Sequence, residues 1–553
     1  MNIEAHFQAL LQQEDTDGDK RITIHDKGPK NYNLDGLEVK GTYALSNLLQ
    51  ELALAKEQGH TEIDPELLTQ PPTQRISAAI KNRCWDGLTR KIDSPEMLHD
   101  PKMPGPPRLY VPENDKLAQA YYKDFVLLPQ IITPEYVRSL NDKPGLLSLA
   151  IDENEGPLPY VVPGGRFNEM YGWDSYFIAL GLLHDGKTHL AKAMLNHQVY
   201  QIRFYGKVLN ANRSYYLTRS QPPFLTRFLK AILKYSQQPQ KWIEEVLRTA
   251  MHEYANVWTK EPRLTSTGLS RYYGEGLGQP PETEPGHYDA VQNPTQEYFT
   301  HDRTVRESGH DTSYRLEDRA AHLCTVDLNS LLYAYETDLA ELLQQHGEIA
   351  GYPSADVWRA RAQQRKNQLT QYCWNAEKGQ FFDYDFTTQA QTGYESATGL
   401  WPLWAGMATP EQAEQAIKHA TLEKGGLAGS SLLSRGPLSD QRPPRQWDYP
   451  YGWAPHQMMA WEGLQNYGHD PSEWAYRWLH MVTQNAVHFN GVIPEKYDVV
   501  TASHEVFAEY GNVGADFDYI TKEGFGWTNA SYQLGLTYLK PEQRKELDQL
   551  GLC

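Results

Sequence analysis

The sequence predicts an all-α fold for most of the chain, with long loops that carry the functional residues. From residue 114 onward, apolar residues recur with helical spacing in one segment after another. Strand patterns are few and short, such as 381–386. The segments between the predicted helices are long and rich in Gly, Pro and Trp. These features suit an all-α barrel whose loops gather at one end, although periodicity alone does not select one helical architecture.

Acidic residues near the start of the chain predict a calcium-binding loop. Residues 15–26 read DTDGDKRITIHD, with Asp15, Asp17 and Asp19 at alternate positions and Asp26 eleven residues after the first. This spacing resembles the calcium loop of an EF-hand, which binds the ion through oxygen ligands. We therefore expect Ca²⁺ to order a small N-terminal region.

Other positions of this loop support the prediction or weaken it. Ile22 stands where such loops place a buried apolar residue, and Arg21 is expected to contribute its backbone carbonyl as a ligand. Lys20 replaces the usual glycine of the tight turn, and the last predicted ligand is Asp in place of Glu, so we expect weak binding. The alternative is a polar turn before a short strand at 21–24.

The remaining elements follow in chain order. Residues 42–58 and 76–91 predict short helices, and the proline-rich segment 100–112 cannot be helical, which makes it a linker. We therefore predict an N-terminal region at 1–112 and a helical domain at 113–553. Within that domain the periodicity predicts helices at 175–205, 222–236, 240–258, 319–346, 354–375, 409–420, 453–467, 471–487 and 527–539. The intervening loop 259–318 is too long to be a simple connector.

Composition limits the classes of partner and the compartment. The 553 residues carry a formal net charge of −18, which argues against nucleic acid and against anionic membranes as partners. No segment has transmembrane length, and the N-terminus lacks the basic start of a secretory signal. The cysteines have no metal-ligand spacing and are predicted to be free thiols, which favours a cytoplasmic location: Cys84, Cys324, Cys373 and Cys553.

Residues 163–176, PGGRFNEMYGWDSY, predict a binding surface for a sugar. Glycines at the turn let the backbone approach a ligand, and Arg166 follows this turn directly. Trp173 and Tyr176 offer flat apolar faces that can stack on the C–H face of a sugar. The polar side chains of Arg166, Glu169 and Asp174 can bind its hydroxyls. The alternative is a structural turn followed by an amphipathic helix with core aromatics.

A second stretch, QWDYPYGWAP at 446–455, repeats the combination of tryptophans, an acid and a Pro/Gly turn, and indicates one shared pocket. With these two motifs the chain resembles the trehalases, glycoside hydrolases that split α,α-trehalose. Further matching motifs are YYLTRSQPP (215–223), RESGHDTS (306–313), PEKYD (494–498) and GFGWTN (524–529). The resemblance implies an (α/α)6 toroid as the catalytic domain. The calcium loop, completed by Gly-Pro-Lys at 28–30, resembles that of the fungal-type neutral trehalases.

Glycoside hydrolysis requires one carboxylic acid that protonates the leaving oxygen and one carboxylate that activates water or attacks carbon. Asp311 and Glu495 lie in loop segments beside Gly or Pro, although the residues alone favour a solvated loop acid or helix cap for any single acid. The resemblance to trehalases implies that Asp311 is the general acid and Glu495 the general base. We also expect the acid to have a raised pKa, because a buried carboxyl holds its proton.

The resemblance implies a set of sugar-binding residues as well. Glu282 lies in a PPETE segment whose contact residue is left open, and Asp516 lies in a glycine-bearing stretch that resembles the family's lid. The expected substrate-binding residues are Arg166, Phe167, Trp173, Asp174, Asn210, Arg219, Gln221, Glu282, Arg306, Trp447 and Asp516. Guanidinium groups suit this role, because they offer several fixed donors to hydroxyl acceptors.

The sequence thus predicts an inverting hydrolase that converts α,α-trehalose to two glucose molecules and is promoted by Ca²⁺. Two alternatives stay open: another (α/α)6 α-glucosidase, and a non-catalytic sugar-binding protein. No cofactor is expected for the chemical step, because no HExxH-type motif, P-loop or dinucleotide fingerprint occurs. The sequence does not indicate an oligomeric state.

Overall fold

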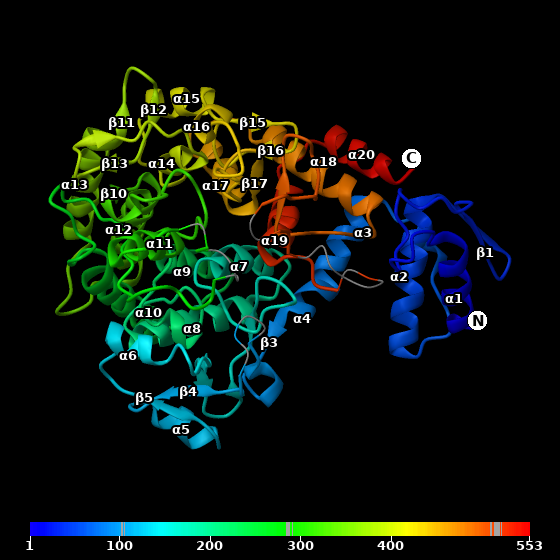
Figure 1. Cartoon of the computed structure of the whole chain (residues 1–553), viewed down its shortest axis with the longest axis horizontal. Coiled ribbons are helices and arrows are strands. Elements are labelled where there is room, and N and C mark those ends of the chain that lie inside the picture. The colour runs from blue at the N-terminus through cyan, green and yellow to red at the C-terminus, as the bar shows by residue number, and fades with distance from the viewer. Residues whose placement is uncertain are drawn as a thin grey trace.

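Six helices form a closed ring at the centre of the computed structural model, within the part of the chain it describes: residues 1–100, 103, 105–283, 288–289, 291–508, 511–513, 520 and 522–552 (Figure 1). They are α7 (Asp174–His184), α9 (Leu225–Tyr235), α12 (Val326–His346), α14 (Trp401–Trp404), α17 (Ala454–Asn466) and α19 (Gly526–Gly535). Each contacts the next in chain order, and α19 closes the ring against α7.

A second layer of helices surrounds this ring. Helix α8 packs on α7 and α9, α10 on α9 and α12, α13 on α12, and α18 on α17 and α19. Trp85 lies beside Gly181 of α7, next to the contact of that glycine with Ala530 of α19, and its indole donates to Asp185 at 2.6 Å. The outer elements are α3 (Pro72–Ala79), α4 (Trp85–Leu88), α8 (Thr188–Tyr205), α10 (Gln240–Glu253), α13 (Ala355–Cys373), α15 (Pro410–Lys418) and α18 (Ser472–His488).

The burial pattern explains which helices lie inside. Helix α7 buries consecutive residues from Asp174 to Ala179, so every side of it is covered, as expected of an inner helix. Helix α10 instead buries one stripe at helical spacing: Ile243, Val246, Leu247, Ala250 and Met251. Helix α7 is thus covered on all sides and α10 is amphipathic, although the inner helix α9 also keeps Arg227, Lys230 and Lys234 outside its buried face.

The N-terminal region has a core of its own. It contains α1 (Ile3–Glu14), the hairpin β1 (Asn31–Leu34) and β2 (Leu37–Lys40), and α2 (Thr42–Gln58), which lie beside the ring in Figure 1. Phe7, Leu10, Ile22 and Leu48 belong to this core, whereas buried residues of 76–92 belong to the core of the ring. The predicted division at residue 112 stays a prediction.

Small strands hold the loops of the ring in place. Strand β17 (Tyr451–Trp453) pairs antiparallel with β18 (Lys496–Asp498), and this pairing joins two of the sequence motifs. A three-stranded parallel sheet contains β4 (Leu109–Pro112), β5 (Val126–Leu128) and β6 (Leu146–Leu147). The other strands are β3 (Thr89–Arg90), β7 (Ile151–Asp152), β8 (Gly156–Pro157), β9 (Tyr160–Val161), β10 (Leu323–Cys324), β11 (Trp374–Asn375), β12 (Gln380–Phe381), β13 (Tyr384–Asp385), β14 (Ala390–Gln391), β15 (Leu422–Glu423) and β16 (Gly426–Leu427).

Most predicted helices are present, with some corrections. The span 175–205 contains two helices, because Gly186 at φ 81° turns the chain between α7 and α8. The span 319–346 is helical as α12 only from Val326. Six helices of the described residues were not predicted: α1, α5 (Lys116–Tyr121), α6 (Pro134–Ser139), α11 (Gln296–Glu307), the ring helix α14, and α20 (Pro541–Gln549). Helix α16 (Leu432–Arg435) is one further short turn.

Candidate active site and calcium loop

One pocket lies where the inner helices begin. The motif residues stand directly before or at the first residues of α7, α9, α17 and α19, and the motif 306–313 covers the end of α11 and the loop that follows it. The pocket brings these segments together. Isolated bridges between Gly164 and Phe525, and between Tyr171 and Ala211, fasten these loops to one another. About 880 Å³ of space, part of it open to solvent, lies between the residues that line the pocket.

Tyr176 and Glu169 do not line the pocket, because Tyr176 stacks on Phe224 and Glu169 is paired with Arg213. The pocket does bring together every described residue of the catalytic and substrate-binding sets that the resemblance implies. These are Arg166, Phe167, Trp173, Asp174, Asn210, Arg219, Gln221, Glu282, Arg306, Asp311, Trp447 and Glu495. Asp516 lies outside the described residues. The pocket is also lined by residues that were not predicted to bind the sugar: Tyr171, Tyr216, Gln446, Trp453, Phe525 and Trp527. Each of these lies within or beside a motif quoted above, and that position was the available signal.

Buried aromatic rings form the wall of the pocket. Trp173 is 2% exposed, and its ring centroid lies 5.7 Å from that of Trp447. Trp447 stacks on Trp453 with the centroids 3.8 Å apart and the planes 3° from parallel. His310 packs between these rings, and burial holds its pKa well below the ordinary value, so the imidazole is neutral. This wall is flat and uncharged, as stacking on a sugar requires.

Two arginines of the pocket are held by carboxylates. Arg219 Nη1 lies 2.7 Å from Glu282 Oε1, and both side chains are buried. Burial raises the pKa of Glu282, but Arg219 and Arg306 outweigh burial, so the net shift is downward and Glu282 is ionised. Arg306 Nε lies 3.2 Å from Asp302 Oδ2 on the same helix. These contacts fix the guanidinium planes before any ligand binds.

The two predicted catalytic carboxylates have different surroundings. The Asp311 side chain is 37% exposed, and its Oδ2 lies 4.0 Å from Arg306 Nη1. The Glu495 side chain is 16% exposed, and its Oε2 lies 2.7 Å from Lys496 Nζ. The backbone of Glu495 is fixed by hydrogen bonds with Val513 and with the Trp527 indole.

Asp174 is the pocket carboxyl that burial affects most clearly. Burial raises its pKa well above the ordinary range, and the charges of Glu495 and Asp311 raise it further. Asp174 is 5% exposed and is the first residue of α7. A protonated carboxyl can donate a hydrogen bond to a sugar oxygen, whereas an ionised one can only accept.

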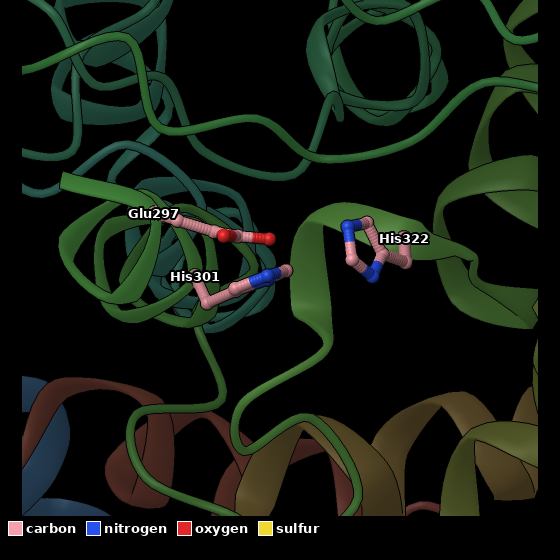
Figure 2. Close-up of side chains that lie close together, drawn as sticks. All are labelled: Glu297, His301 and His322. Atoms are coloured by element: carbon pink, nitrogen blue, oxygen red, sulfur yellow. The ribbon is translucent and has the colours of Figure 1, made fainter. Parts of the chain in front are cut away.

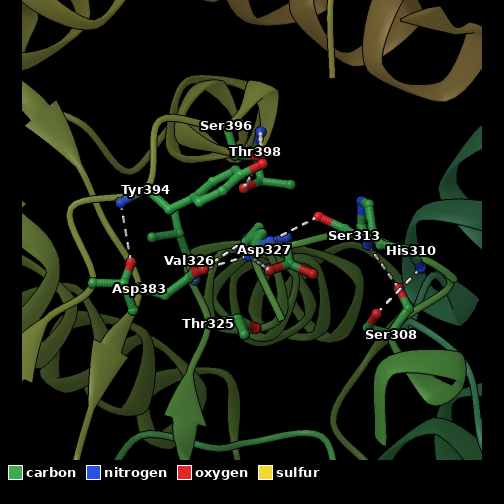
Figure 3. A network of polar contacts seen from close by, with 12 residues as sticks. Ser308, His310, Ser313, Thr325, Val326, Asp327, Asp383, Tyr394, Ser396 and Thr398 are labelled. Carbon is green, nitrogen blue, oxygen red and sulfur yellow. Dashed lines mark hydrogen bonds and ion pairs between the residues drawn. The ribbon is translucent and has the colours of Figure 1, made fainter. Parts of the chain in front are cut away.

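A buried polar network holds the Asp311 loop. Ser313 Oγ and the Tyr314 backbone N–H donate to Asp448 at 2.7 and 2.8 Å. Arg315 Nε donates to Asp383 Oδ2 at 2.7 Å, and the same guanidinium also contacts Asp327 at the start of α12. Figure 3 shows Ser313 and His310 on one side of Asp327, with Asp383 on the other. The residues that follow Asp311 are therefore anchored by hydrogen bonds to Asp448 and Asp383.

The predicted calcium loop brings three carboxylates together. Oxygens of Asp15, Asp17 and Asp19 lie within 4.8 Å of one another, and burial raises the pKa of Asp19 while Asp17 and Asp15 add to the shift. Lys20 has φ 68°, the left-handed conformation for which EF-hand loops use glycine. The fold of the loop and its oxygen donors thus fit Ca²⁺.

The other predicted ligands of this loop are placed differently. Asp26 is buried outside the three-carboxylate group, and its two oxygens accept hydrogen bonds from the backbone N–H groups of Thr16 and Thr23. Its place among the ligands, like that of the Arg21 carbonyl, stays a prediction. Ile22 is 0% exposed, as an EF-hand-type loop requires.

A second cluster of metal-type ligands is formed by Glu297, His301 and His322 (Figure 2). The Nδ1 atom of His301 accepts a hydrogen bond from the Ala321 backbone N–H at 3.1 Å, so its neutral ring carries the proton on Nε2. A metal ion at Nε2 would have to displace that proton, and Nδ1 could not take it up because it already accepts the hydrogen bond from Ala321. This cluster therefore supports no metal site.

A ring of paired helices with acids and stacked tryptophans at one end defines a glycoside hydrolase. Residues 56–297 and 287–540 match the Trehalase family, and residues 7–35 match the neutral trehalase Ca²⁺ binding domain. The chain belongs to the trehalase family. The fold class predicted from the resemblance, an (α/α)6 toroid with a small N-terminal calcium-binding region, is confirmed.

Similar proteins cover nearly the whole chain. The cytosolic neutral trehalase of Saccharomyces cerevisiae is 44% identical over 100% of this chain and 84% of its own. That of Emericella nidulans is 45% identical over 99% of this chain and 84% of its own. The solved structure of neutral trehalase Nth1 from S. cerevisiae superposes with a TM-score of 0.78 at 42% identity, over 87% of this chain and 96% of that one. Among the described residues, no helix is long and apolar enough to cross a membrane.

Proposed function

We propose that this protein hydrolyses α,α-trehalose to two glucose molecules with inversion, with Asp311 as general acid and Glu495 as general base. One observation carries the proposal: a single pocket contains both acids together with all the described residues that the resemblance to trehalases implies for sugar binding. The names of its relatives, neutral trehalases, support the substrate, and the word cytosolic in those names supports a cytoplasmic location.

The geometry suggests how each group acts. Trp173 and Trp447 offer faces for the sugar rings, and the fixed guanidinium groups donate to hydroxyl oxygens. Asp311 gives its proton to the glycosidic oxygen while Glu495 removes a proton from the attacking water, so the new C–O bond forms on the face opposite the leaving group. Asp174, with its raised pKa, donates a hydrogen bond from a neutral carboxyl.

We also propose that Asp15, Asp17 and Asp19 hold Ca²⁺ and that the ion promotes activity from a distance. The ion would neutralise carboxylates that otherwise repel one another and so order the loop. The loop contacts the ring through the Ile24 N–H, which donates to the His488 carbonyl at 3.1 Å. Ser46 Oγ of α2 also donates to Asn490 at 2.7 Å. Through such contacts the ion can favour one arrangement of the neighbouring loops.

Glucose release from trehalose and from maltose, measured side by side, tests the proposed function. We expect release from trehalose and little or none from maltose. The reverse preference would identify another α-glucosidase of the same fold. Binding of trehalose without release of glucose would identify a sugar-binding protein.

A further inference from the structure

A buried ammonium group lies directly behind the proposed base. The Lys496 side chain is 0% exposed, and its Nζ lies 2.7 Å from Glu495 Oε2. The same Nζ donates to Gln446 Oε1 at 2.8 Å and lies 5.0 Å from the centroid of the Trp453 ring. The three donors of an ammonium group thus face a carboxylate, an amide oxygen and an aromatic face.

Gln446 extends this contact to the loop of the proposed acid. Its Nε2 donates to the backbone carbonyl of Asp311, while its Oε1 accepts from Lys496. The pairing of β17 with β18 sets Trp453 directly opposite Lys496, and the Trp453 indole donates to the Gln446 carbonyl at 2.7 Å. An unbroken series of polar contacts therefore joins the Asp311 loop to Glu495.

We propose that Lys496 is a positioning residue for Glu495 and that Gln446 ties this pair to the Asp311 loop. Lys496 contacts Oε2 of the base and sets a buried positive charge beside the carboxylate. Within the described part of the chain, Oε1 of Glu495 accepts no hydrogen bond, which leaves it for the attacking water. The inference rests on the proposed function, in which Glu495 is the general base.

The charges around the pocket explain why a cation is required at this position. The other charged groups that line the pocket are Asp174, Glu282, Asp311, Arg166, Arg219 and Arg306. Asp174 shows what a carboxyl does here without a cation in contact: burial and its acidic neighbours raise its pKa. Glu495 shares the pocket with Asp174 and Asp311, so removal of Lys496 would leave its anion poorly compensated and favour the uptake of a proton.

The experiment compares the pH dependence of kcat/KM for the parent enzyme, Lys496→Met and a control, Lys230→Met. Lys230 is also ion-paired, to Asp338 at 3.0 Å, but it lies on α9 and does not line the pocket. We expect the kcat/KM of Lys496→Met to be about 10-fold or more below the parent's at the parent's optimum pH. We also expect the acidic limb of its pH profile to move upward by about one pH unit or more. Lys230→Met should keep the parent's profile. A uniform loss in Lys496→Met with no movement of the limb would overturn the inference.

A second variant covers the case in which Lys496→Met does not fold. Gln446→Met removes the link and keeps the Lys496–Glu495 pair, so we expect kcat to fall about 10-fold or more while the acidic limb stays in place. A kcat equal to the parent's would overturn the link. Glu495→Gln, measured in the same assay, separates a failure of the proposed function from a failure of the inference about Lys496. Its full activity would refute the proposed function, whereas its inactivity beside a parent-like Lys496→Met would refute only the inference.

Discussion

Asp311 and Glu495 differ in what holds them. Glu495 is mostly buried against an ammonium group, whereas the Asp311 side chain is 37% exposed beside Arg306. The raised pKa expected for Asp311 stays a prediction. At this exposure the burial that it requires must come from the bound sugar, which would displace water from the carboxyl and keep it protonated until it gives its proton to the leaving oxygen.

The proposed roles of these two residues predict a loss of turnover without a loss of stability. Asp311→Asn and Glu495→Gln keep the shape of each side chain and remove its acid or base function. We expect kcat to fall by about 10³-fold or more, with the melting temperature close to the parent's. Glu153→Gln, in an exposed turn, is the matched control and should behave as the parent does. A large drop in melting temperature with modest loss of kcat would indicate structural roles.

At the scale of elements, Asp448 connects the loop before α12 to the loop before α17. It accepts hydrogen bonds from Ser313, the Tyr314 backbone and Tyr394, yet burial still raises its pKa to about 6. The folded protein therefore binds this proton more tightly than the unfolded chain. It follows that Asp448 lowers stability above that pKa, and that this penalty is relieved as pH falls from about 6 toward about 4.

Asp448→Asn should remove this pH dependence. We expect the free energy of unfolding of the parent to fall relative to the variant by about 1 kcal/mol between about pH 5 and about pH 7.5. Urea denaturation at the two pH values measures the difference. The same difference at both values would show that Asp448 keeps an ordinary pKa in the folded protein.

The calcium loop stores strain at a single residue. Lys20 has φ 68°, a conformation that costs a residue with a Cβ about 1 kcal/mol relative to glycine. If calcium orders the loop, that cost reduces its affinity. We therefore expect Lys20→Gly to bind calcium several-fold more tightly than Lys20→Ala, because both variants remove the charge and only glycine removes the strain. Equal affinities, measured by calorimetry, would show that the left-handed turn exists equally well without the ion.

At the scale of the whole molecule, calcium links the N-terminal core to the ring. A chelator should lower both activity and melting temperature in the parent, and added calcium should restore them. Asp15→Ala/Asp17→Ala should resemble the chelated parent and should not respond to either treatment. If chelation changes neither property in the parent, the loop is a polar turn and the proposed role of calcium is abandoned.

The sequence predicted more of the site than of the ring that assembles it. The motifs directly before α7 and α17 identified the pocket, because tryptophans, acids and arginines around Gly and Pro turns have few structural uses. Helix α11 was missed because its buried positions include His301, Arg303 and Arg306, so it lacks an apolar stripe. The contact of α19 with α7 and the meeting of Lys496 with Gln446 depend on pairings across the fold, and no local pattern encodes them.

The stereochemistry of the first products tests the central claim most directly. Inverting hydrolysis of α,α-trehalose releases one glucose as the β-anomer and leaves the other as the α-anomer, because water attacks only one of the two anomeric carbons. Proton NMR, recorded before the anomers interconvert, should show the two in equal amounts. Signals of α-glucose alone would contradict inversion and, with it, the assignment of Glu495 as a base that activates water.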